Sequence, residues 1–126
     1  RACQEVLELG DPLVMFPEGT RRHGPVIKAE EMNAGPAFVA LRAGVPIVPM
    51  GMAGTDYSMR PGSSMIKPVK VYMVLGEPLY PPTFEGRVPR QAVTDFTEEL
   101  RQAMQVVFDE AQRLAGRPAL PEPEEN

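Results

Sequence analysis

A long amphipathic stripe near the C-terminus constrains the fold more than any other feature of this sequence. Its apolar positions recur at intervals of three and four residues: Val93, Phe96, Leu100, Met104, Val107, Ala111 and Leu114. This spacing predicts a helix that begins near Pro89 and is terminated by Gly116 and Pro118. Because such a helix has one apolar face, the rest of the chain must offer a surface that covers it.

Three shorter patterns predict that this surface is a β-sheet. Alternating apolar residues predict a strand at 69–75, and two apolar runs predict strands at 12–16 and 45–50. Helical patterns occupy residues 1–9 and 35–42. The alternation of strands and helices predicts an α/β fold, a mainly parallel sheet covered by helices, with a right-handed crossover from 12–16 to 45–50.

The chain length fits one domain. Its 126 residues are 43% hydrophobic, as in globular proteins, and we assign 1–116 to one domain and 117–126 to a disordered acidic tail. The segments 22–34 and 55–68 are expected to be loops. A single cysteine, Cys3, excludes an internal disulfide and fits a reducing compartment.

The chemistry concentrates in a hexapeptide at residues 16–21, Phe-Pro-Glu-Gly-Thr-Arg, which follows the predicted strand 12–16. Arg21 offers a planar fork of donors suited to phosphate oxygens, and Gly19 allows close approach of the backbone. Thr20 adds a hydroxyl, and Glu18 can either hold Arg21 or accept a bond from a substrate hydroxyl. Together these groups suit a polyol phosphate.

The hexapeptide resembles the glycerol-phosphate-binding motif of the phospholipid and glycerol acyltransferases, the lysophosphatidic acid acyltransferase family. Residues 43–49, Ala-Gly-Val-Pro-Ile-Val-Pro, resemble that family's valine–proline block. The resemblance runs from about residue 5 to about residue 80. It implies that Glu18, Gly19, Thr20 and Arg21 bind the acceptor, and that the acyl-donor side is shaped by five residues: Val45, Pro46, Ile47, Val48 and Pro49.

The family's catalytic signature is missing. That signature is a histidine followed five positions later by aspartate, before the hexapeptide. Here the one histidine, His23, follows the motif, and its fifth successor is Lys28. Since the chain starts at Arg1 inside a helical pattern, we expect a C-terminal portion of a longer acyltransferase, incomplete at its N-terminus, rather than a protein that has lost catalysis.

The resemblance implies acyl transfer from a thioester, acyl-CoA or acyl carrier protein, to a hydroxyl of lysophosphatidic acid or glycerol phosphate. It implies no other cofactor and no metal, and a peripheral position on the cytoplasmic side of a membrane. An excess of basic residues between 17 and 70, seven Lys/Arg against four Asp/Glu, is consistent with an anionic substrate or lipid surface. Nucleic-acid binding is not expected, because the net charge is −4 and the basic residues are not interleaved with stacking aromatics.

Alternative explanations remain open for several features of the sequence. The sequence also permits a non-catalytic lysophospholipid-binding or anion-binding module. Pro46 and Pro49 would also flank a short buried strand. His23 would also suit a solvated loop, and Arg21 a structural ion pair with Glu18. The eight methionines suit core filling or the lining of an acyl channel.

Overall fold

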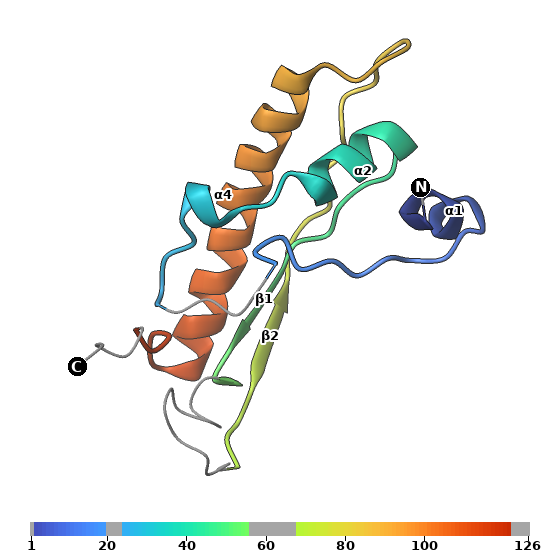
Figure 1. Cartoon of the computed structure of the whole chain (residues 1–126). Coiled ribbons are helices and arrows are strands. Elements are labelled where there is room, and N and C mark those ends of the chain that lie inside the picture. Colours follow the sequence, from blue (N-terminus) through green and yellow to red (C-terminus); the bar gives the residue numbers. More distant parts are fainter. Residues whose placement is uncertain (1, 20–23, 56–67, 122–126) are drawn as a thin grey trace.

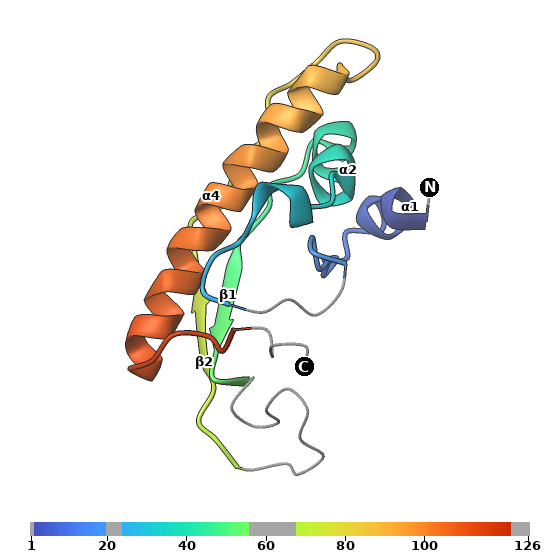
Figure 2. The same ribbon diagram turned by 60° about the vertical axis from the view of Figure 1, so that its left-hand side comes forward.

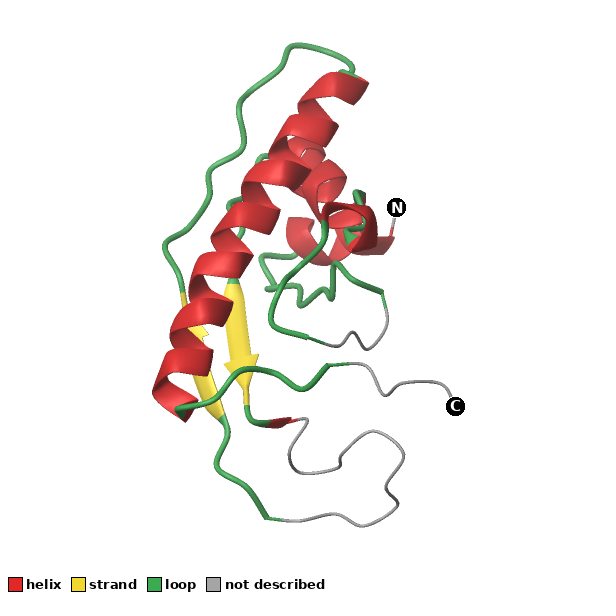
Figure 3. Ribbon diagram, turned by 90° about the vertical axis from the view of Figure 1, so that its left-hand side faces the viewer, coloured by secondary structure: helices red, strands yellow, loops and turns green. Residues whose placement is uncertain are grey.

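The computed structural model describes residues 2–19, 24–55 and 68–121 (Figure 1). Within them lie a short N-terminal helix, a 3-10 turn at Ala29–Glu31, a second helix, two strands and a long C-terminal helix (Figure 3). Their bounds are α1 Ala2–Glu8, α2 Gly35–Ala43, β1 Met50–Ala53, β2 Tyr72–Leu75 and α4 Arg90–Ala115. The three expected helices are therefore confirmed, with ends close to those predicted.

Helix α4 is the longest element, and its stripe is the inner face of the molecule. Pro89 precedes the first helical residue, and Gly116 ends the helix with a left-handed backbone at φ 75°. Phe96, Leu100 and Val107 of the stripe are buried. Figure 2 shows α4 running along the two strands and past α2, so that one helix packs on both the sheet and the second helix.

The sheet differs from the expected one. Strands β1 and β2 pair antiparallel, with Met50 opposite Leu75 and Ala53 opposite Tyr72, so the prediction of a mainly parallel sheet is wrong for this pair. The physical reason lies in the connection. Parallel neighbours need a crossover connection that returns the chain to the same end of the sheet, whereas consecutive strands can pair antiparallel without one, as β1 and β2 do.

The expected strand at 12–16 is not formed. These residues are extended, but no described strand lies beside them to complete a hydrogen-bonded ladder, and Val14 and Phe16 are 74% and 76% exposed. The predicted right-handed crossover between 12–16 and 45–50 therefore has no strand at its start. The expected strand at 45–50 is shifted to β1, and its first part is the extended approach to that strand.

The two faces of the sheet have different surroundings. Gly51 and Ala53 point toward α4 and are buried, and a Cβ at Gly51 would lie 2.6 Å from the backbone of Val107. The opposite face exposes an apolar group that we call the open sheet face: Met50, Met52, Met73 and Leu75. Three of the eight methionines thus lie on this surface rather than in the core.

A second packing layer joins α2 to the N-terminal half of α4. Ala37, Ala40 and Leu41 of α2 contact Phe96, and half-buried residues of the connecting segments, including Ile47 and Leu79, close the cluster. Among the residues described, no helix combines the length and apolar character that a membrane crossing requires.

Candidate functional site

The N-terminal side of the hexapeptide forms a tight turn. The amide of Gly19 donates to the carbonyl of Phe16 at 3.0 Å, and Gly19 has φ 68°, a conformation that favours glycine. The carbonyl of Pro17 accepts from the amide of Asn33 at 2.7 Å, which fastens the turn to the segment before α2. Half-buried Glu18 lies in the turn, next to Gly19. Thr20 and Arg21 lie outside the described residues, as does His23.

The chain is held again immediately after the hexapeptide. At Gly24 the backbone has φ 88°, and its amide donates to the carbonyl of Leu120 at 2.8 Å. Leu120 belongs to the segment that follows α4, and the amide of neighbouring Ala119 donates to the Gln112 side chain at 2.8 Å. The first part of the expected acidic tail is thus bonded to α4 and to Gly24, and residues 122–126 lie outside the described residues.

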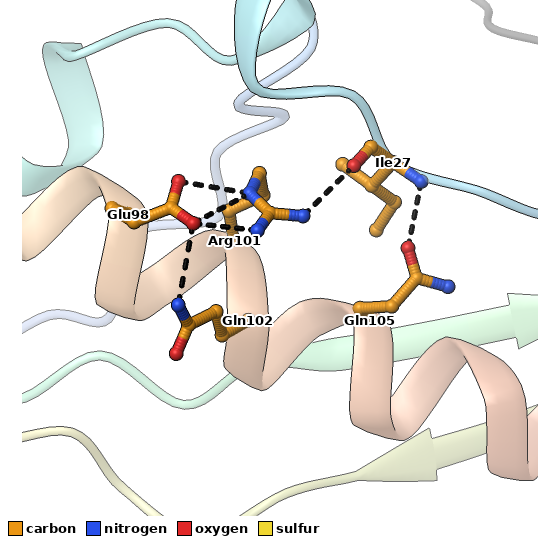
Figure 4. A network of polar contacts seen from close by, with 5 residues as sticks. All are labelled: Ile27, Glu98, Arg101, Gln102 and Gln105. Atoms are coloured by element: carbon orange, nitrogen blue, oxygen red, sulfur yellow. Dashed lines mark hydrogen bonds and ion pairs between the residues drawn. The ribbon is translucent and has the colours of Figure 1, made fainter.

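Two side chains of α4 fasten the backbone of residues 25–27 (Figure 4). Gln105 accepts from the amide of Ile27 at 2.7 Å and donates to the carbonyl of Pro25 at 2.9 Å. Arg101 donates to the carbonyl of Ile27 at 3.1 Å. Both backbone polar groups of the buried Ile27 are satisfied by side chains in place of a neighbouring strand. We call Arg101 and Gln105 the helix clamp.

The clamp arginine is itself oriented by a carboxylate. The Nε of Arg101 donates to the two Glu98 oxygens at 3.1 and 2.9 Å, and a terminal nitrogen of the guanidinium adds a third bond. This forked pair lowers the pKa of Glu98 and raises the pKa of Arg101, so both groups are charged near neutral pH. Gln102 also donates to Glu98, one turn away.

The segment Val45–Pro49 is anchored elsewhere. Ile47 exchanges two backbone hydrogen bonds with Leu79, at 2.9 and 2.7 Å, and the carbonyl of Pro49 accepts from Gly76 at 2.8 Å. Prolines 46 and 49 have no amide to donate, which limits the ladder to a single bridge before β1. Pro49 is buried and Ile47 half-buried, whereas Pro46 is exposed and Val48 is 50% exposed.

Sequence reasoning found the hexapeptide but missed the residues that hold it. The apolar stripe predicts the buried face of α4, but it does not predict that Arg101 and Gln105 bond the backbone of residues 25–27. A signal was present, since Arg101 and Gln105 directly follow the stripe residues Leu100 and Met104, and Gln112 is buried. A long polar side chain beside a buried stripe indicates that backbone groups nearby need partners.

Comparison with known proteins shows which proteins this chain is similar to. Residues 1–53 match the sequence profile of the Acyltransferase family, and this stretch includes the hexapeptide and the Val45–Pro49 segment. This match covers less than half of the chain. It is 36% identical over 80 residues to a 1-acyl-sn-glycerol-3-phosphate acyltransferase of Chlamydomonas reinhardtii, and 37% identical over 71 residues to one of Limnanthes douglasii. These alignments cover 63% and 56% of this chain.

A solved structure shares the fold. The 1-acyl-sn-glycerophosphate (LPA) acyltransferase PlsC from Thermotoga maritima aligns with 93% of this chain at a TM-score of 0.62 and 27% identity. The chain spans 24% of the length of each of the two curated relatives and 44% of the PlsC chain. The resemblance to the lysophosphatidic acid acyltransferase family is therefore confirmed over part of the domain.

Proposed function

We propose that this chain supplies the acceptor-phosphate site of a lysophosphatidic acid acyltransferase. The observation that carries the proposal is that the chain is held on both sides of Thr20 and Arg21, by the Gly19 turn within the hexapeptide and by the helix clamp after it. A loop fixed at both ends can present several donors to one anion without a large loss of entropy on binding. The named relatives act on acyl-glycerol phosphates, which supports the same substrate class here.

Each residue of the motif has an expected role. Arg21 binds the acceptor's phosphate through its guanidinium fork, and Thr20 adds a hydroxyl. Gly19 contributes its backbone conformation rather than its amide, because that amide already donates to Phe16. Glu18 orients Arg21 or accepts a bond from the glycerol hydroxyl.

Acyl transfer itself needs a base that this sequence does not provide in the family's position. The acceptor hydroxyl attacks the thioester carbonyl, its proton passes to a histidine, and the thiol of the donor leaves. The one histidine here follows the motif, so this chain is expected to bind the acceptor and to transfer no acyl group alone. Val45–Pro49, with Val48 exposed, is the expected acyl-donor side, for acyl-CoA or acyl carrier protein.

The expected place of action is the cytoplasmic side of a membrane, with the chain bound peripherally. Exposed Val14 and Phe16 directly precede the acceptor motif, where apolar side chains would meet a lipid surface first. Flotation with phosphatidylglycerol-containing vesicles tests this expectation. Replacement of both residues by serine should reduce co-flotation, and unchanged co-flotation would contradict a role in membrane contact.

Calorimetric titration of the chain with sn-glycerol 3-phosphate tests the acceptor site. Arg21→Ala should weaken binding by about ten- to a hundredfold, the value of a charge-assisted bond, whereas Arg22→Ala, which removes the same charge one residue later, should weaken it less. Equal losses of affinity in the two variants would mean that the motif binds the phosphate only through its positive charge. That result would favour the general anion-binding module.

A further inference from the structure

The helix clamp joins two parts of the chain that lie 74 to 80 residues apart in sequence. Pro25 lies four residues after Arg21, so the clamp, together with the bond between Gly24 and Leu120, holds the chain just after the hexapeptide. The clamp side chains come from the middle of α4, whose opposite side is fixed on the sheet by the contact between Gly51 and Val107. The end of the loop is thereby held by α4, the most extensively packed element of the described structure.

We infer that Gln105, with Arg101, is a positioning residue for acceptor-phosphate binding. The inference rests on the proposed function and adds the residues that hold the site in place. Gln105 meets the amide of Ile27 with its oxygen and the carbonyl of Pro25 with its nitrogen, so it fixes both the position and the direction of this backbone. Without these two bonds this backbone would keep only the contacts of Gly24 with Leu120, of Pro25 with Gln112 and of Ile27 with Arg101, so ordering it would add to the cost of binding the phosphate.

Gln105 separates positioning from electrostatics, because it is uncharged and replacing it leaves the charge near the phosphate unchanged. Gln105→Met keeps the length of the side chain and removes its hydrogen bonds to Ile27 and Pro25, together with the one it donates to Asp109 on the same helix. We expect the dissociation constant for sn-glycerol 3-phosphate, measured by calorimetry on the 126-residue chain, to rise roughly two- to tenfold, because ordering the loosened backbone becomes part of the cost of binding. Hydrogen exchange at the Ile27 amide should accelerate in the same variant.

Two control variants define the result. Gln102→Met makes the same substitution three residues earlier, where the side chain bonds only Glu98 among the described contacts, and should leave the dissociation constant unchanged. Val107→Ala weakens the packing of α4 on the sheet without touching the clamp, and reports what lower stability alone does to binding. If Gln105→Met does not fold, Gln105→Asn, whose side chain is one methylene too short for both contacts, tests the same bonds.

The possible outcomes are distinguishable. Weaker binding in Gln105→Met alone supports the inference. Wild-type affinity in Gln105→Met, or an equal loss in Val107→Ala, overturns the inference and leaves the acceptor site intact. No binding of glycerol 3-phosphate to the wild-type chain overturns the proposed function and the inference together.

Discussion

Replacing Gly51 by alanine tests the packing of α4 on the sheet. A Cβ at this position would lie 2.6 Å from the carbonyl carbon and oxygen of Val107 and 2.7 Å from the amide nitrogen of Phe108. Ordinary contact begins near 3.4 Å, so the strand and the helix would have to separate by roughly 0.8 Å. All three nearest atoms are backbone atoms inside a helix, so no side-chain rotation can relieve the overlap.

We expect Gly51→Ala to destabilise the chain by about 1–3 kcal/mol, the usual cost of overpacking. At about 4 °C for each kcal/mol in a chain of this size, the melting temperature should fall by about 4–12 °C. The assay is thermal unfolding followed by circular dichroism. The matched control is Gly35→Ala at the start of α2, where a Cβ would meet only the Asn33 side chain, 3.3 Å away, and the lower backbone entropy of alanine should leave stability equal or higher. A Gly51→Ala melting temperature equal to that of the wild type would refute this account of the helix–sheet contact.

Three further predictions concern the site and its charges. The purified chain should transfer no acyl group from acyl-CoA to lysophosphatidic acid above background, and measurable product would contradict the assignment of catalysis to residues it lacks. Arg21→Lys should weaken glycerol 3-phosphate binding although it keeps the charge, because lysine cannot form the two-pronged contact; unchanged affinity would mean that only charge matters. The pair with Arg101 lowers the pKa of Glu98, so this carboxylate contributes stability above its ordinary value of 4.5 that is lost as the pH falls through the lowered pKa. As the pH is lowered below 4.5, the free energy of unfolding measured by urea titration should therefore fall less in Glu98→Gln than in the wild type. Equal falls in the two proteins would show that the pair adds no stability.

The helices could be predicted from sequence because each carries its own signal. The α4 stripe, the proline before it and Gly116 after it are local features, and the structure places the helix where they indicate. The pairing of strands is not local. Residues 69–75 alternate correctly, but their pattern says nothing about the direction of the neighbouring strand, and an antiparallel pair with β1 is formed.

The candidate site divides in the same way. The residue types and spacing of the hexapeptide predict a phosphate site, which stays a prediction because Thr20 and Arg21 lie outside the described residues. The partners of Pro25 and Ile27 could not be predicted, because a polar side chain on a helix does not reveal which distant backbone it meets. The prediction of a strand at 12–16 is wrong for a related reason. An apolar run of this kind becomes a strand only when another strand is available beside it.

The position of the helix clamp has a consequence for the interpretation of truncated gene sequences. The motif that identifies the family lies within residues 1–53, whereas Arg101 and Gln105 lie about 50 residues beyond that stretch. A premature stop codon after residue 89 would leave this stretch in place and remove α4, which holds the backbone just after the hexapeptide. Such a gene product would still match the same profile, and yet we would expect Gly24, Pro25 and Ile27 to lose their hydrogen-bond partners.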